Sequence, residues 1–322
     1  MGKARIALLS NPRSTGNISQ LPRVRAFCAE HPDIFHYEVE RAEQVGDALR
    51  TIARVRPRVL VINGGDGTVQ AALTELINGG HFGGKLPPVA VLPNGKTNLI
   101  ALDLGAQGDA IEALRRLHEL ASGDLEDHLV ARELIALTNA KQQKPVIGMF
   151  LGGAGLADTM LYCREKIYPL GLPNGLSHVL AAVAVVFGLL GLSGRFLPKS
   201  PAPIEVKVRR HGTLSGRFGL LAVTTLERLL LGSEVRTAHS GSLKLLAVEH
   251  RGSSMIRGLI AALKGQLGAK KLTGVHLEEA DEISIEGDRS SVFLDGEMFQ
   301  ARIGDPIRLT RAAPLSFVRL AA

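Results

Sequence analysis

The sequence contains no tryptophan, and aromatic residues make up only 4% of its 322 residues. Many proteins bind single-stranded nucleic acid by stacking bases on aromatic side chains, and this chain is poorly supplied with them. It also lacks the block of consecutive Lys and Arg residues that is typical of nucleic-acid-binding arms. We therefore expect no nucleic-acid partner.

Cysteine is scarce too, because Cys28 and Cys163 are the only two and they lie far apart in the sequence. Their spacing fits neither a disulfide framework nor a metal site, and it agrees with a reducing compartment. The first apolar run, Arg5–Ser10, is too short for a signal peptide and is typical of a buried strand. These features favour a cytoplasmic protein.

Long hydrophobic runs are limited to residues 176–192, LSHVLAAVAVVFGLLGL. A membrane-spanning helix needs about 20 apolar residues, and this segment is short and contains His178 and two glycines. We interpret it as a buried or interfacial helix. It either lines a pocket or packs inside the second domain described below.

The remaining composition is that of a globular protein, with 45% hydrophobic and 21% charged residues. At 322 residues the chain exceeds the usual size of one compact core, which predicts two domains. Its net charge of +7 is compatible with attraction to phosphorylated substrates or anionic lipid headgroups, and equally with a soluble protein that is simply basic.

Apolar runs and helical patterns alternate in the first part of the chain. Arg5–Ser10, Val59–Ile62 and Val89–Leu92 each end in a loop of Asn, Gly or Pro, with amphipathic segments such as Val45–Val55 between them. This alternation predicts an α/β domain with a mostly parallel sheet, whose ligands bind at the carboxyl ends of the strands.

After about Asp127 the pattern changes to short strands separated by turn residues, which is typical of an antiparallel β-sandwich. The strands we expect are 131–138, 146–151, 204–209, 218–224, 243–248, 282–285, 291–294 and 298–303. We therefore predict an α/β domain over residues 1–128 and a C-terminal β-sandwich domain over residues 129–322. The last residues are expected to return to the first domain.

The most specific segment is Gly64-Gly65-Asp66-Gly67-Thr68, between a buried strand and a helix. Glycines allow the backbone to approach a ligand closely, and the N–H groups at the start of a helix bind phosphate oxygens. The carboxylate of Asp66 would repel phosphate by itself, so we expect it to hold Mg²⁺ bound to ATP or to orient the attacking group.

Two further loops follow strands of the same predicted sheet. The loop 11–17 supplies Asn11, Pro12, Ser14 and Thr15, and the loop 93–98 supplies Gly95, Lys96, Thr97 and Asn98 at the start of a helix. Either loop alone is compatible with an ordinary turn. Because all three loops end strands at one sheet edge, we expect them to form one nucleotide site.

In their order along the chain, these loops resemble those of the diacylglycerol kinase catalytic family. That family has an Asn-Pro loop, then Gly-Gly-Asp-Gly-Thr, then Pro-x-Gly-Thr-x-Asn-Asp, and Asp-Gly-Glu near the C-terminus. The corresponding residues here are Asn11–Ser14, Gly64–Thr68, Pro93–Asn98 and Asp295-Gly296-Glu297. The resemblance implies an ATP-dependent lipid kinase. ATP would bind between the nucleotide-binding domain, residues 1–128, and the domain for the lipid substrate, residues 129–322, whose helical run 176–192 would line a pocket for an acyl chain. Glu297 would be the catalytic base, with Asp295 beside it.

The chain departs from the family pattern at several positions. Leu99 replaces an Asp, Lys96 replaces a Thr, and Ser240 replaces the Asp associated with a second Mg²⁺ site in bacterial members. The sequence therefore leaves open the second metal site, the nucleotide preference and the acceptor lipid. An NAD kinase-like phosphotransferase and a non-catalytic relative that binds nucleotide or lipid stay as alternatives.

The segment 254–267 places several apolar residues on one helical face, among them Met255, Ile256 and Leu259, with Arg257 and Lys264 nearby. Such a face is typical of a basic interfacial helix, although core packing produces the same pattern. Together with the resemblance, it favours peripheral contact with the anionic inner face of a membrane. A homodimer is an assembly that the sequence leaves open.

Overall fold

The computed structural model describes residues 5–95, 98–106, 108–162, 200–226, 243–264, 267, 271–288 and 290–320. The chain forms two compact units. Unit 1 contains Met1–Ala136, Lys144–Met149 and Ala312–Ala322, and unit 2 contains Leu137–Gln143 and Phe150–Arg311. The long strands β5 (Leu129–Thr138) and β16 (Ile307–Val318) therefore contribute residues to both units.

Unit 1 is built around a parallel sheet with the strand order β2-β1-β3-β4. These strands are β1 (Ile6–Ser10), β2 (Ile34–Glu38), β3 (Val59–Asn63) and β4 (Val89–Val91). Every residue of β1, β3 and β4 is buried, as expected for strands covered on both faces. At the far edge, Phe317 of β16 pairs in parallel with Val89.

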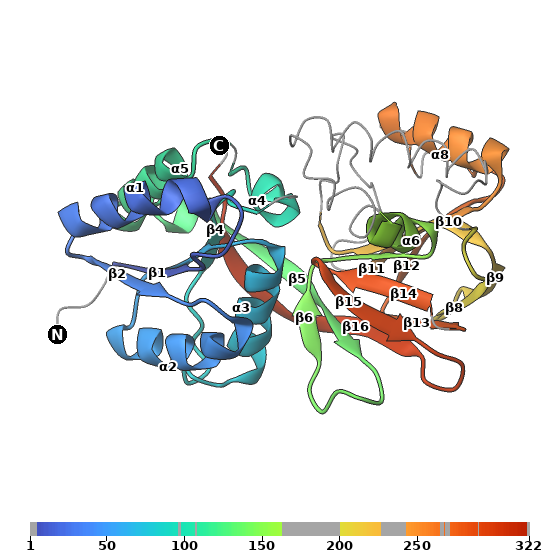
Figure 1. The fold of residues 1–322 in the computed structure, drawn as a ribbon, viewed down its shortest axis with the longest axis horizontal. Helices are drawn as coiled ribbons and strands as arrows, with labels where there is room; N and C mark the ends of the chain where they lie inside the picture. The colour runs from blue at the N-terminus through green and yellow to red at the C-terminus, as the bar shows by residue number, and fades with distance from the viewer. Residues whose placement is uncertain are drawn as a thin grey trace. The chain divides into compact units, whose positions relative to one another are not determined.

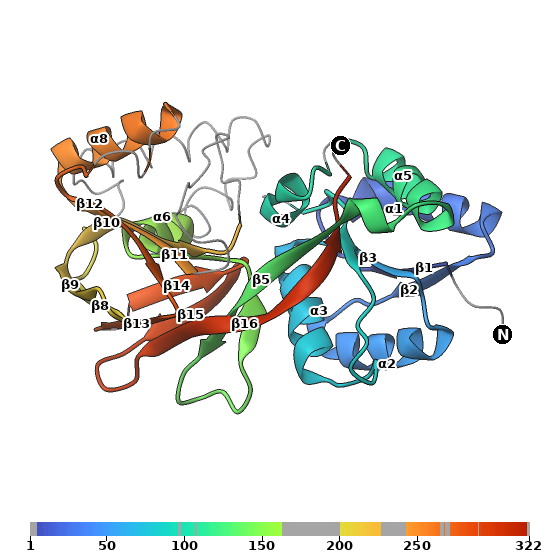
Figure 2. The ribbon, with the colours of Figure 1, turned by 180° about the vertical axis from the view of Figure 1, so that it is seen from behind.

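Helices cover both faces of this sheet, with α1 and α5 on one face and α2 and α3 on the other (Figures 1 and 2). The helical segments of unit 1 are α1 (Asn17–Glu30), η1 (Ala42–Gln44), α2 (Val45–Val55), α3 (Asp66–Asn78), α4 (Leu99–Asp103), α5 (Ala110–Ser122) and η2 (Glu126–His128). A core of Val24, Phe27, Leu114 and Leu117 packs from α1 and α5 onto β1 and β3. The predicted α/β domain is confirmed.

Unit 2 contains an antiparallel sheet with the strand order β12-β11-β10-β7-β14-β15. Its strands are β7 (Phe150–Gly153), β10 (Phe218–Thr224), β11 (Leu243–Glu249), β12 (Val275–Ala280), β14 (Ser290–Leu294) and β15 (Glu297–Ala301). Two helices, α6 (Gly155–Tyr162) and α8 (Gly252–Leu263), pack against it.

A second antiparallel arrangement in unit 2 joins β8 (Ile204–Val208), β9 (Gly212–Gly216), β13 (Glu282–Gly287) and the first part of β16. The prediction of antiparallel β structure in the C-terminal part is thus confirmed. Among the residues that the structure describes, no helix is long and apolar enough to span a membrane. The predicted helix over residues 176–192 lies outside the described residues.

The segment 146–151, which we predicted to be one strand, is two strands. β6 (Val146–Gly148) pairs with β5 and belongs to unit 1, whereas β7 begins at Phe150 and belongs to unit 2. Gly148 lies at the break, but one glycine inside an apolar run is weak evidence for the end of a strand. The two strands are separate because they pair with different neighbours, β6 with β5 and β7 with β10 and β14.

Candidate functional site

The three loops predicted to bind nucleotide meet at the carboxyl ends of β1, β3 and β4 in unit 1. The N–H of Asn11 donates to the carbonyl of Asn63 (2.9 Å), and its Nδ2 donates to Thr68 Oγ1 (2.9 Å). The hydroxyl of Ser14 donates to the carbonyl of Asn94 (2.9 Å). The loop after β1 is therefore hydrogen-bonded to both of the other loops.

A network of buried asparagines, which our reading of the sequence did not assign to the site, lies beneath these loops. Asn94 Nδ2 donates to Asn17 Oδ1 (2.9 Å) and to Asn63 Oδ1 (2.6 Å). Asn17 Nδ2 in turn donates to the carbonyls of Asn11 (2.8 Å) and Asn63 (3.0 Å). Buried amides are costly unless they are hydrogen-bonded, so this network fixes the three loops relative to one another. The sequence contained one indication of this network, an Asn at the end of β3 and an Asn shortly after each of β1 and β4.

Gly65, the residue before α3, has no side chain although its backbone does not require glycine. Its φ of −81° and ψ of 176° are accessible to any residue. A β-carbon at this position would lie 3.4 Å from Ser14 Oγ and 4.0 Å from Gly95 Cα, which are ordinary contacts. Neither strain nor crowding explains the glycine, whereas close approach of a ligand to the start of α3 does.

Replacing Gly65 with Ala is therefore expected to weaken nucleotide binding without unfolding the protein. We expect ATP affinity to fall by roughly tenfold or more because the methyl group displaces the bound phosphates. The stability should change by only about 1 kcal/mol, the usual scale at a helix N-cap. Calorimetric titration with ATP, together with thermal unfolding, measures both quantities.

Gly64→Ala is the matched control for a loss of stability in the same loop, because a β-carbon there would lie 2.7 Å from Thr68 Cβ. This clash should destabilise the fold by about 1–3 kcal/mol. Unchanged ATP affinity in a folded Gly65→Ala variant would remove this loop from the nucleotide site.

Asp66 is the first residue of α3, beside the loop that follows β4. A β-carbon at Gly95 would lie 3.4 Å from Asp66 Oδ1, which places the carboxylate next to that loop. Within the described residues, no cluster of three or more His, Cys, Asp or Glu side chains could hold a metal ion. A single carboxylate fits Mg²⁺ that arrives with nucleotide phosphates, since such ions commonly take only one or two protein carboxylates.

The loop after β4 is shaped by Asn98, whose φ of 52° lies in the left-handed region. Asn98 Oδ1 accepts a hydrogen bond from the Gly95 N–H (2.6 Å), which closes a tight turn before α4. Lys96 and Thr97, both predicted to contact the nucleotide, lie outside the described residues. Of the other predicted contacts, Pro12 is partly buried and Thr15 is exposed, while Gly67 lies in the first turn of α3.

A buried ion pair holds α4, the helix that follows this loop. Arg132 Nε on β5 donates to Asp103 Oδ2 on α4 over 3.1 Å, and the two side chains are only 9% and 0% exposed. A surface pair in this position would contribute little, but a buried pair fixes its two elements strongly. Sequence reasoning did not identify either residue.

Unit 2 contains the other predicted catalytic segment, the turn between β14 and β15. Asp295 and Gly296 both have positive φ, 44° and 90°, and Leu294 pairs with Glu297. This is the two-residue hairpin that Asp-Gly favours. Asp295 is buried, and its N–H donates to the Phe150 carbonyl (2.9 Å) while its Oδ1 accepts from the Phe150 N–H (3.0 Å).

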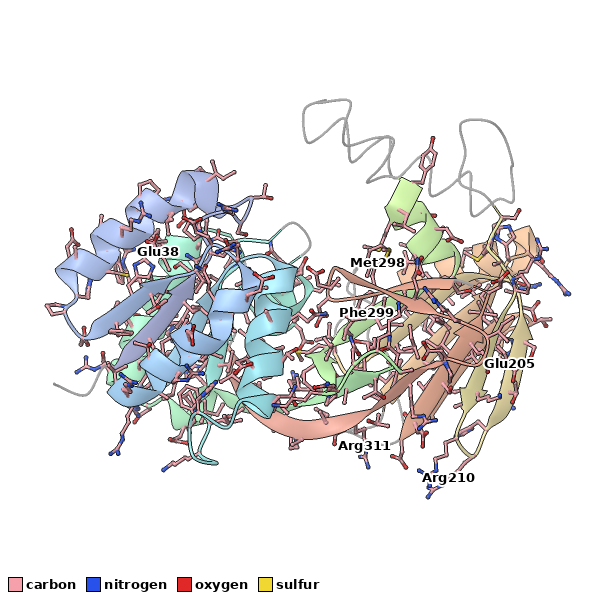
Figure 3. The ribbon with its side chains drawn as sticks, turned by 60° about the horizontal axis from the view of Figure 1, so that its bottom comes forward. Glu38, Glu205, Arg210, Met298, Phe299 and Arg311 are labelled. Atoms are coloured by element: carbon pink, nitrogen blue, oxygen red, sulfur yellow. The ribbon has the colours of Figure 1, made fainter. Side chains whose placement is uncertain are left out.

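These contacts give the two carboxylates of the turn different environments. Asp295 ties the turn to β7, whereas Glu297 is exposed at the start of β15. Met298 and Phe299 follow it on the same strand (Figure 3). The turn thus presents Glu297 to solvent, whereas Asp295, the other predicted catalytic carboxylate of the turn, is hydrogen-bonded to the backbone of Phe150.

The segment after β7 carries one carboxylate, Asp158 on α6. Burial raises the pKa of Asp158 above the usual value for an aspartate. Ala154 just before α6 has a φ of 56°, and a β-carbon at Gly155 would lie 2.5 Å from the Gly219 carbonyl. The glycine here serves close packing of the helix on β10. Ser240 lies outside the described residues.

Comparisons with known proteins show similarity in sequence over the first domain and in the fold of the whole chain. Residues 5–126 match the model of the diacylglycerol kinase catalytic domain. Two crystal structures from Bacillus anthracis str. Sterne, one of a diacylglycerol kinase and one of a proposed diacylglycerol kinase, have TM-scores of 0.60 and 0.67. Each is 16% identical to this chain and covers 98% of it and 97% of its own chain.

The fold is shared more widely. An ATP complex of an NAD kinase from Archaeoglobus fulgidus is 9% identical, with a TM-score of 0.50, over 97% of this chain and 93% of its own. Yeast NADH kinase is 10% identical, with a TM-score of 0.51, over 99% of this chain and 84% of its own. The curated proteins searched by sequence contain no match to this chain.

The two-unit architecture is thus the fold found in lipid kinases and NAD kinases, which are phosphotransferases. Residues 5–126, the N-terminal region of the chain, match the diacylglycerol kinase catalytic domain, which supports the resemblance that the motifs indicated.

Proposed function

We propose that this protein is an ATP-dependent lipid kinase that transfers the γ-phosphate of ATP to the hydroxyl of a membrane lipid. The observation that carries the proposal is Gly65. In a domain of the diacylglycerol kinase catalytic family, it leaves open the start of α3, where backbone N–H groups suit a phosphate. The exposed Glu297 in unit 2 supplies the carboxylate that the transfer needs.

The transfer can be divided among the residues of the two units. In unit 1, the loops containing Asn11, Ser14 and Gly65 hold the nucleotide, and Asp66 would hold the Mg²⁺ that neutralises phosphate charge. The lipid oxygen forms a bond to the γ-phosphorus as the bond to the bridging oxygen of ADP breaks. Glu297 accepts the proton of the lipid hydroxyl, and Asp295 positions the turn that carries Glu297.

Radiolabelled phosphate transfer tests this function. The protein is incubated with γ-labelled Mg²⁺-ATP and a mixed bacterial lipid extract, and the products are partitioned between chloroform and water. Label in a chloroform-soluble lipid is the expected result, and its chromatographic mobility narrows the class of acceptor.

NAD kinase-like activity is the second candidate, because NAD kinases share the fold. It predicts no labelled lipid and a labelled, water-soluble dinucleotide when NAD is added. A protein that binds ATP but labels neither acceptor would be a relative that binds without catalysing, and the lipid kinase proposal would be wrong.

Asp66→Asn should lower the rate of transfer, because it removes a carboxylate next to the loop after β4 and keeps the size of the side chain. We expect a loss of about 10²-fold in kcat, the scale of one electrostatic group in a transfer site. Raising the Mg²⁺ concentration should recover part of the rate if Asp66 acts through the metal. A wild-type rate at low Mg²⁺ would remove Asp66 from the site.

A further inference from the structure

Helix α8 packs on its sheet through Met255 and several small residues, while most of its large apolar residues face away. The prediction that Met255 shares a face with Ile256 and Leu259 was wrong, because Met255 is buried and the other two are exposed. The side that faces β11 and β12 carries the buried residues Ser254, Met255, Gly258 and Ala261. A β-carbon at Gly258 would lie 3.5 Å from Val248 and 3.7 Å from Val275, so the helix lies close against the two strands. This close packing fixes which side of α8, the helix drawn in orange in Figures 1 and 2, faces inward.

The opposite side of α8 is apolar and exposed. Ile256, Leu259, Ile260 and Leu263 are 47%, 44%, 46% and 61% exposed, and their spacing places them in one stripe along the helix. A helix on a protein surface normally turns such a stripe toward the core. Here the arrangement is reversed, so core packing does not account for these residues.

Arg257 and Lys264 supply positive charge beside the stripe, and the sequence from 250 to 277 contains no Asp or Glu. Arg251, just before the helix, is paired with Glu249 (3.4 Å). Arg257 and Lys264 are exposed and seven residues apart, which places them along one flank of the helix. An exposed apolar stripe with a basic flank is the pattern of a helix that lies in a membrane interface.

We propose that the outer face of α8 docks on an anionic lipid surface, with Ile256, Leu259, Ile260 and Leu263 inserted among the lipids and Arg257 and Lys264 at the headgroups. A second copy of the chain fits less well, because a two-fold contact through this face would bring two flanks of the same charge together. The choice of lipid over other anionic partners rests on the proposed function. The outward-facing apolar stripe and the basic residues beside it are observed independently of that function.

Sedimentation with vesicles tests the surface directly. The wild-type protein should bind phosphatidylglycerol vesicles at least tenfold more tightly than phosphatidylcholine vesicles. Leu259→Glu combined with Leu263→Glu should reduce binding to phosphatidylglycerol vesicles by at least tenfold, while Arg257→Gln with Lys264→Gln should mainly reduce the preference for anionic lipid. Ile18→Glu and Ile303→Glu, at residues 75% and 76% exposed elsewhere, are controls that should bind within twofold of wild type.

The absence of tryptophan from the sequence provides a second measurement that does not depend on a loss of binding. Leu263→Trp introduces a single fluorophore into the stripe, and its emission should shift to shorter wavelength when phosphatidylglycerol vesicles are added. Ile18→Trp should show no shift. Equal emission of Leu263→Trp with and without vesicles, or unchanged binding of the double Glu variant, would overturn the proposal.

Failure of docking and failure of the proposed function give different results. If docking alone is wrong, the protein still phosphorylates lipid but the double Glu variant binds vesicles as wild type does. If the lipid kinase function alone is wrong, vesicle binding depends on the stripe but no lipid is labelled. A wild-type dimer in light scattering that the double Glu variant dissociates would assign the stripe to a second copy and also overturn the proposal.

Discussion

Glu297→Gln is expected to reduce phosphoryl transfer by about 10³-fold while leaving ATP binding within about threefold of wild type. The amide keeps the size of the side chain but does not accept the proton of the lipid hydroxyl, and general-base catalysis contributes about 10²–10⁴-fold. Glu297 is exposed at the start of β15, so its replacement removes no packing. Single-turnover transfer of labelled phosphate measures the rate, and calorimetric titration with ATP measures the affinity.

Two further variants separate the chemical role of Glu297 from its position on the hairpin. Glu205→Gln removes an exposed carboxylate from β8 in the same unit and should leave transfer unchanged. Asp295→Asn keeps an acceptor for the Phe150 N–H and should lower kcat less than Glu297→Gln does, because it alters only the support of the turn. If Glu297→Gln transfers phosphate at the wild-type rate, the base must be sought elsewhere.

The fold could be predicted from the sequence where a buried segment is a simple apolar or periodic run of residues. The predicted ends of Val45–Val55 and Phe218–Thr224 agree with α2 and β10, because each is a periodic or apolar segment bounded by polar residues. β16 was missed because charged residues and Pro314 interrupt its apolar positions. β9 was missed because it begins and ends at glycine and is largely exposed.

In the candidate site, too, some features could be predicted from the sequence and others could not. The loops after β1, β3 and β4 were expected to meet, because parallel strands end at one sheet edge, and their hydrogen bonds join them. The asparagine network could not be predicted, because the partner of an amide is decided by residues distant in sequence. Likewise, the Asp-Gly-Glu turn was identified, but the positive φ of Asp295 and its bond to Phe150 follow only from the strand beside it.

Arg132→Met should give the largest loss of stability among the variants considered, about 3–5 kcal/mol in the free energy of unfolding of unit 1. The substitution takes from Asp103 the cation that is hydrogen-bonded to its fully buried carboxylate. Because Asp103 ends α4, the loop that precedes this helix should also move, and ATP affinity should fall with stability. Urea unfolding followed by circular dichroism gives the stability, and ATP titration well below the transition gives the affinity.

The double variant Arg132→Met, Asp103→Leu decides whether the pair serves stability or geometry. Replacing both charges by apolar groups removes the desolvation cost, so stability should return to within about 1–2 kcal/mol of wild type. Arg115→Met, which breaks the exposed pair with Glu112 on α5, is the matched control and should cost less than about 1 kcal/mol. If the double variant regains stability but not ATP affinity, the pair is kept for the position of α4 and its loop. If Arg132→Met alone costs no more than Arg115→Met, the buried pair does not hold α4 in place.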